Sequence, residues 1–161
     1  LGTGTLVLNG GTLQGDGVAR TLANNIVLDE DSTIGGTSAL QFDGTFGNLT
    51  DDYRTITINN SGGTTFDDIA IAGSGARQLT IAGTGDSIVN GVISGGSSGF
   101  SSLSKTGSGK LTLNGTNTYG GNTYFDGGTI EIGSDSVFGS SLLSLFGDSV
   151  LQGDGVTRTI S

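Results

Sequence analysis

The chain has 161 residues, of which 32 are glycine, and it contains no histidine, cysteine, methionine, tryptophan or proline. The absence of cysteine excludes disulfides and thiolate metal sites, and a net charge of −9 disfavours binding to nucleic acid or to anionic lipid. Hydrophobic residues make up 33% of the chain and are regularly placed, so we expect a folded strand-and-turn protein rather than a solvated linker.

Short triplets in which the first and third residues are apolar recur along the chain. Alternation with a period of two indicates short strands with one buried face, and no helical period is sustained. Several triplets are followed at once by Asn or Gly, which adopt the backbone conformations of sharp corners. The sequence therefore predicts an all-β protein. In chain order the triplets are Leu6/Leu8, Ile56/Ile58, Ile69/Ile71, Leu79/Ile81, Leu111/Leu113, Ile130/Ile132 and Leu143/Leu145.

The chain also contains a long internal repeat. Residues 13–22 read LQGDGVARTL and residues 151–160 read LQGDGVTRTI, so eight of ten positions are identical at an offset of 138. We expect one repeat at about residues 1–138, followed by the beginning of the next at 139–161. On this interpretation the chain is a slice of a longer repetitive stalk.

A fold that continues from one copy into another is a solenoid, because each coil buries its apolar side chains only against its neighbours. Very short strands with glycine-rich corners favour a parallel β-helix, and we predict a single continuous solenoid over residues 1–161. At about 20 residues per coil, the repeat would make about seven coils. The alternative is a pair of antiparallel sandwich domains with hairpin turns at 9–11, 90–91 and 114–115.

One segment carries a family pattern. Residues 103–139 read LSKTGSGKLTLNGTNTYGGNTYFDGGTIEIGSDSVFG, which resembles the passenger-associated transport repeat of bacterial autotransporters. The segment between Asp43 and Asp86 fits the pattern of such passengers more loosely. The positions that match the repeat are Lys105, Gly107, Gly109, Leu111, Leu113, Gly115, Asn117, Thr118, Tyr119, Gly121, Thr123, Phe125, Gly128, Thr129, Ile130, Ile132 and Gly139.

The resemblance implies a right-handed parallel β-helix that is exported through a bacterial outer membrane and lies outside the cell. In that family the repeat is structural and helps the passenger to fold and to be secreted. We therefore expect a non-catalytic structural or adhesive protein that forms a cell-surface stalk, fibre or filament. Its expected partners are neighbouring repeats of the same protein, stacked end to end, and surface carbohydrate or other cells, with no nucleic acid and no direct membrane insertion.

The repeated LQGDGV motif places a charged pair at a corner. Asp16 and Arg20 are spaced to pair across that corner, and Asp154 and Arg158 are spaced to do the same in the second copy. An exposed pair contributes at most about 1 kcal/mol, so we expect it to fix the conformation of a loop. Ligand binding at this corner is the alternative.

The densest acidic cluster is Asp29, Glu30 and Asp31, which is the one weak candidate for a metal site. Three carboxylates can hold a hard cation such as calcium through oxygen ligands. The calcium-binding pattern G-G-x-G-x-D is absent, so an exposed charged turn is the plainer interpretation. We expect no cofactor.

The carboxylate pairs Asp51-Asp52 and Asp67-Asp68 offer the alternative of a β-helical polysaccharide-active enzyme. Such enzymes place a basic or imidazole group close by, and here only Arg54 and Arg77 are near in sequence. Adjacent residues on a strand point to opposite faces, so at most one member of each pair faces any one cleft. We assign no catalytic residue.

A carbohydrate-binding module is the related alternative, because exposed aromatic rings stack on sugars. In the family pattern, however, the tyrosine and the residue at the Phe125 position pack within the coil. Core packing is therefore the plainer interpretation. The aromatic candidates are Tyr119, Tyr124, Phe125, Phe138 and Phe146.

Overall fold

Alternating apolar and polar residues form short strands from one end of the chain to the other. The computed structural model describes residues 2–48, 53–71, 75–96, 100–139 and 142–158. Within these ranges every strand pairing is parallel, and no helix is present that could cross a membrane. The predicted all-β solenoid is confirmed, and the antiparallel sandwich alternative is wrong.

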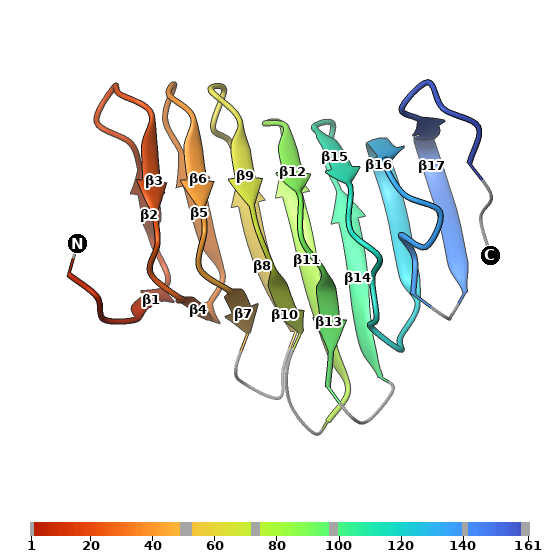
Figure 1. The fold of residues 1–161 in the computed structure, drawn as a ribbon, viewed down its shortest axis with the longest axis horizontal. Helices are drawn as coiled ribbons and strands as arrows, with labels where there is room; N and C mark the ends of the chain where they lie inside the picture. Colours follow the sequence, from red (N-terminus) through yellow and green to blue (C-terminus); the bar gives the residue numbers. More distant parts are fainter. Residues whose placement is uncertain (1, 49–52, 72–74, 97–99, 140–141, 159–161) are drawn as a thin grey trace.

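The strands are arranged on three faces that we number by the order in which the chain visits them (Figure 1). The first face holds β1 (Leu6–Asn9), β4 (Ile26–Glu30), β7 (Phe46–Asn48), β10 (Ile69–Ile71) and β13 (Ile93–Gly95). The second face holds β2 (Thr12–Gln14), β5 (Ser32–Gly35), β8 (Tyr53–Ile58), β11 (Arg77–Gly83) and β14 (Ser101–Thr106). The third face holds β3 (Arg20–Leu22), β6 (Leu40–Phe42), β9 (Thr64–Phe66), β12 (Ser87–Val89) and β15 (Lys110–Leu113).

Two long strands join the second and third faces near the C-terminal end. The first half of β16 (Thr123–Ile132) pairs with β14, and its second half pairs with β15. Strand β17 (Leu143–Gly153) then pairs with β16 along both halves. Figure 1 shows the coils side by side along the long axis, with the two termini at opposite ends.

The stack has about six coils, and the prediction of about seven is wrong. Ile26 pairs with Phe46, 20 positions later, but Phe46 pairs with Ile69 and Ile69 with Ile93, which are 23 and 24 positions later. The connection from the first face to the second accounts for the difference, because it takes one residue between β4 and β5 and four between β7 and β8.

Inward side chains of successive coils stack in columns and form one continuous core. On the first face Ile26, Phe46, Ile69 and Ile93 occupy the same register position and are fully buried. Burying each such side chain contributes about 1.5–3 kcal/mol, which is realised only when the neighbouring coil is in place. Three phenylalanines, Phe42, Phe46 and Phe66, meet in this core with ring centroids 5.0–6.3 Å apart.

The core thins at both ends of the stack. Leu13 and Leu22 in the first coil are only partly buried, and Leu145 in β17 is 49% exposed although it lies in register with the buried Phe125. Among the described residues, β1, β2 and β3 pair only with the coil that follows them, and β17 pairs only with β16. Each end therefore exposes strand edges together with inward-facing leucines.

Candidate functional site

The glycines of the family pattern lie where the corners of neighbouring coils come into contact. Gly107 follows β14 with a φ of +77°, and a Cβ atom built on it would lie 2.5 Å from the carbonyl oxygen of Gly83 one coil earlier. A Cβ atom on Gly115 would lie 1.8 Å from the carbonyl oxygen of Gly91. These approaches are too close for any side chain, so glycine is required for the corners to stack at the spacing of the strands.

Lys105 occupies a core position of β14, in register with Ile81 on one side and Phe125 on the other. It is 2% exposed, and its Nζ donates hydrogen bonds to the carbonyl oxygens of Thr106 at 2.8 Å and Gly107 at 3.0 Å. The ammonium group therefore satisfies two carbonyls of the corner that follows the strand. Burial lowers the pKa of Lys105 to about 8, against the weaker opposing effect of the Asp86 charge.

Asn117 connects three coils at a place where, among the described residues, the first face has no strand after β13. Its Oδ1 accepts a hydrogen bond from the backbone N–H of Ile93 at 2.7 Å, in the preceding coil. Its Nδ2 donates to the carbonyl oxygen of Val137 at 2.6 Å, in the following coil. The side chain is buried and takes the place of a ladder hydrogen bond on each side.

Tyr119 lies inside the coil, and its ring is fully buried. Its hydroxyl is 2.6 Å from the hydroxyl oxygen of Thr123, which is also buried, and 3.5 Å from the carbonyl oxygen of Val137. Burial raises the pKa of Tyr119 to about 12. Phe125 and Phe138 are buried as well, so three of the five aromatic candidates for sugar stacking belong to the core.

The remaining positions of the family pattern complete the same coils. Leu111 and Leu113 in β15 are fully buried and pair with Ile130 and Ile132 in β16. Thr118 is exposed, and Thr129 is partly buried in β16. Gly109, Gly121 and Gly128 each lie against a backbone carbonyl of an earlier coil.

Aspartate side chains at the corners form a set of contacts that the sequence analysis missed. In each case a carboxylate oxygen accepts a hydrogen bond from a backbone N–H 24 positions later, in the next coil. The signal was present in the sequence, since Asp and Asn recur at the ends of strands, but their partners are distant in the chain. The pairs are Thr55 with Asp31 at 2.7 Å, Val92 with Asp68 at 2.8 Å and Lys110 with Asp86 at 2.8 Å.

The three residues of the predicted acidic cluster, Asp29, Glu30 and Asp31, do not act together, because each has different surroundings. Asp31 accepts from the N–H of Thr55, whereas the backbone carbonyl of Asp29 accepts from Nε of Arg54 at 2.5 Å. Glu30 is exposed at the end of β4, where the ladder with β1 shifts by one residue. Within the described ranges, no three His, Cys, Asp or Glu side chains gather closely enough to hold a metal ion. Calcium binding at this cluster stays the weaker alternative to an exposed charged turn.

Of the carboxylates considered for catalysis, the pair that the structure describes lies on a different part of the coil from the arginines. Asp51 and Asp52 are outside the described residues. Asp67 and Asp68 lie at the corner between β9 and β10, and Asp68 accepts a hydrogen bond from the next coil. Arg54 and Arg77 lie in β8 and β11 on the second face, and Arg77 is only 2% exposed.

The two repeated corners have the same local geometry. Nη2 of Arg20 lies 2.6 Å from Oδ2 of Asp16, and Nη2 of Arg158 lies 2.6 Å from Oδ2 of Asp154. In both corners Nε of the arginine donates to the other carboxylate oxygen. The hydrogen bond from the arginine is the main reason why the pKa of each aspartate is lowered. Asp135 adds a second acidic neighbour to Arg158, at 3.9 Å.

These corners nevertheless lie at different places in the solenoid. Leu13 precedes the first corner on the second face, because β2 pairs with β5. Leu151 precedes the second corner on the third face, because it pairs with Ile130 in the half of β16 that continues β15. The offset of 138 residues therefore spans six coils and one additional face.

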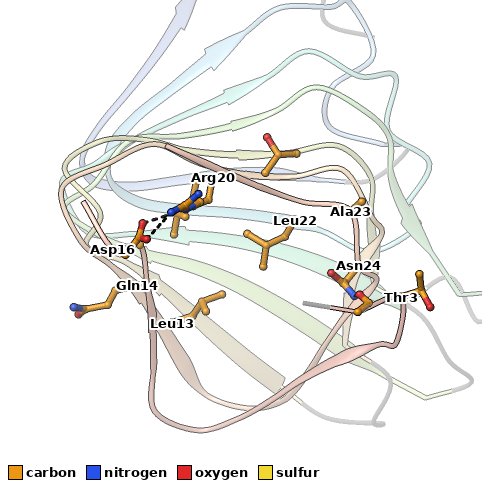
Figure 2. Close-up of a pocket in the computed structure, with 12 residues that line it drawn as sticks. Thr3, Leu13, Gln14, Asp16, Arg20, Leu22, Ala23 and Asn24 are labelled. Atoms are coloured by element: carbon orange, nitrogen blue, oxygen red, sulfur yellow. Dashed lines mark hydrogen bonds and ion pairs between the residues drawn. The ribbon is translucent and has the colours of Figure 1, made fainter. Parts of the chain in front are cut away.

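The first corner forms part of the rim of a hollow of about 630 Å³ at the N-terminal end of the stack. Leu13, Leu22 and Leu40 contribute apolar lining, and the Asp16–Arg20 pair lies at one side (Figure 2). Figure 2 shows Leu13 and Leu22 inside the outline of the coil and Gln14 outside it. The hollow is the open end of the core column.

Residues 103–132 match the family model of the passenger-associated-transport-repeat. No curated protein and no solved structure matches the chain significantly. The matched residues are the ones whose buried contacts join successive coils from β14 to β16. The chain is therefore a β-solenoid that carries a passenger-associated transport repeat, and in both respects it is similar to the β-helical passengers of autotransporters.

Proposed function

We propose that this chain is a structural segment of an exported passenger, in which it serves as a non-catalytic stalk outside the cell. The observation that carries the proposal is that residues 103–132 make contacts within and between coils. Their glycines, Lys105, Asn117 and Tyr119 all make contacts within or between coils, and these contacts hold the solenoid together.

The placement of the polar groups supports a structural role over an enzymatic one. The aspartates at the corners accept hydrogen bonds from the backbone of the next coil. Asp68 lies at the corner between the third and first faces, whereas Arg54 and Arg77 lie in strands of the second face. A polysaccharide-cleaving site needs two carboxylates that face one another across a substrate. Asp31, Asp68 and Asp86 are instead each engaged by a backbone N–H of the next coil.

A display experiment tests the proposal. The chain, with an N-terminal epitope tag, is placed between a signal peptide and an autotransporter translocator in a Gram-negative host. We expect the tag to be detected on the surface of intact cells and to be removed by protease added outside. Gly107→Val should reduce the surface signal at least about tenfold, because the side chain would collide with the preceding corner and stop the coils from stacking.

Gly4→Val is the matched control, because a Cβ atom at Gly4 meets no atom within 4 Å. It should be displayed as well as the parent chain. Equal display of the Gly107 and Gly4 variants would contradict the proposed role of the repeat in export. Saccharide cleavage by the purified chain, lost in Asp67→Asn, would contradict the non-catalytic assignment.

A further inference from the structure

The outward side of the second face is uncharged over three successive coils in the middle of the stack. Strands β8, β11 and β14 lie side by side in ladders without a register shift (Figure 1). The structure describes every residue of these three strands, and their charged side chains, Arg54, Arg77 and Lys105, occupy the inward register. The outward positions hold Tyr53, Thr55 and Thr57, then Gln78, Thr80 and Ala82, then Ser102, Ser104 and Thr106.

Three aromatic side chains lie on this same surface. Tyr53, at the start of β8, is 62% exposed, and Phe100, one residue before β14, is 66% exposed. Tyr124 in β16 lies in register with Ser104 and is partly exposed. Strands β8 and β14 are two coils apart, which is about 10 Å along the stack. Exposed aromatic rings are enriched at binding surfaces, where a partner buries them.

The polar groups between the rings are held in fixed orientations. Nε2 of Gln78 donates a hydrogen bond to Oγ1 of Thr80 at 3.2 Å, and Nδ2 of Asn122 donates to the hydroxyl oxygen of Tyr124 at 2.9 Å. Each amide also has an oxygen that can accept a hydrogen bond, and each threonine hydroxyl can both donate and accept. The face therefore presents rows of hydrogen-bonding groups that repeat at the strand spacing of about 4.8 Å.

This combination matches the chemistry of a neutral sugar chain. The C–H groups of a pyranose ring pack on the negative face of an aromatic ring, while its hydroxyls exchange hydrogen bonds with amides and hydroxyls. The exposed carboxylates of Asp31 and Asp126 border the surface, in register with Thr55 and Thr106. They repel a ligand that carries carboxylate or sulfate groups. A straight ladder also favours an extended chain over a coiled one.

We propose that the outward side of the second face, from β8 to β16, binds an extended neutral polysaccharide, with Tyr53 and Phe100 stacked on sugar rings. The inference goes beyond the stalk function and does not depend on the route of export. Neither of these two rings belongs to the aromatic residues that the family pattern or the sequence singled out. Their exposure on one uncharged face identifies them.

Calorimetric titration of the purified chain with two cellulose derivatives tests the inference. Hydroxyethylcellulose is neutral, and carboxymethylcellulose has the same extended backbone with added carboxylates. We expect the neutral polymer to bind, and the acidic polymer to bind at least about tenfold more weakly at physiological salt. An absence of binding to hydroxyethylcellulose, or equal binding of the two polymers, would overturn the proposal.

Variants of the two exposed rings locate the surface. Tyr53→Ala and Phe100→Ala should each weaken binding of hydroxyethylcellulose at least about tenfold, because each removes a stacking platform. Tyr53→Phe retains the ring and should bind within about threefold of the parent chain. Ile88→Ala, which removes exposed apolar area from β12 on the third face, is the control and should bind like the parent. Binding that both alanine variants retain in full would place the ligand elsewhere and overturn the site.

Two further measurements separate binding from folding and from export. The midpoint of urea unfolding should be the same in the parent chain and in Tyr53→Ala, since that side chain is mostly in water. Tyr53→Ala should also be displayed on cells as well as the parent chain. Loss of display in Tyr53→Ala would assign the ring to the solenoid rather than to a ligand, and would overturn the binding surface without touching the stalk.

Discussion

Strands β15 and β17 share the apolar-x-apolar pattern but differ in their neighbours. Strand β15 has a paired strand on both sides, whereas β17 pairs only with β16 among the described residues. Leu111 and Leu145 both follow the apolar-x-apolar pattern, yet Leu111 is completely buried and Leu145 is 49% exposed. Local pattern fixes the direction of a side chain, whereas a neighbouring coil on each side is needed to bury it. The energetic value of one motif therefore depends on its place in the stack.

The same contrast holds for the polar groups. Asn117 and Lys105 lie inside the stack and satisfy backbone groups that would otherwise be buried without partners. The Asp16–Arg20 pair lies on the surface, with both side chains more than half exposed. Water competes for every partner in an exposed ion pair, so such pairs contribute little to stability.

The largest difference is expected between two leucine truncations. Leu111→Ala removes a side chain packed from both sides and should lower the free energy of unfolding by about 3–4 kcal/mol. Leu145→Ala should lower it by less than about 1 kcal/mol, because half of that side chain is already in contact with water. Urea unfolding at low protein concentration compares them. Equal losses would mean that the end coil is covered in solution.

A second effect is expected for the asparagine that connects three coils. Asn117→Ala leaves the N–H of Ile93 and the carbonyl of Val137 buried without their partner, and should cost about 2 kcal/mol. Urea unfolding measures the loss. Hydrogen exchange of the Ile93 amide should also become faster. An unchanged exchange rate would show that this amide does not depend on the asparagine.

Stability should change with pH in a direction set by Lys105. The pKa of Lys105 is about 8 in the folded chain, against 10.5 for an ordinary lysine, which we take for the unfolded chain. Between these two pH values the unfolded chain therefore binds more protons than the folded chain. The free energy of unfolding should therefore rise from pH 8 towards pH 10, on the order of 1–3 kcal/mol. Thermal unfolding across this range measures it, and Lys105→Met should abolish the rise.

Tyr119 should reverse the trend at higher pH. Its pKa is about 12 in the folded chain against an ordinary 10.0, so above pH 10 the unfolded chain releases a proton that the folded chain keeps. Stability should fall as the pH rises through this range. Tyr119→Phe removes the fall if the assignment is correct, and a fall of the same size in that variant would assign it to other groups.

The smallest effect is expected at the surface pair. Asp16→Asn removes the charge that pairs with Arg20 but leaves an exposed side chain of the same shape. We expect no measurable change in the midpoint of urea unfolding, with or without added salt. A clear loss in this variant would show that the corner carries more of the stability than its exposure indicates.

The sequence predicted the features that depend on near neighbours along the chain. Strands β10, β11 and β15 follow from their apolar triplets. The transport repeat was predicted at residues 103–139 from its ordered glycine, apolar and polar positions, and residues 103–132 match the family model. Contacts between coils could not be predicted in the same way, because they join residues about 20 to 25 positions apart and the interval changes with each connection. The link from Asp86 to Lys110 is one such contact.

The number of coils was missed for the same physical reason. A uniform coil of about 20 residues fits the ladder from Ile26 to Phe46 but not that from Ile69 to Ile93, where the corner between the first and second faces is longer. Corners at the surface accept additional residues at little cost, since loop closure depends weakly on length. The strand pattern alone does not reveal them.

The repeat offset of six coils and one face gives the chain the geometry of a screw. Leu13 and Leu151 are related by a translation along the stack combined with a shift from the second face to the third. Where further copies follow at this offset, each LQGDGV corner points in a different direction from the one before, and the first direction returns with the fourth copy. A partner approaching such a stalk from the side of any one face would meet this corner at every third copy, rather than at every copy.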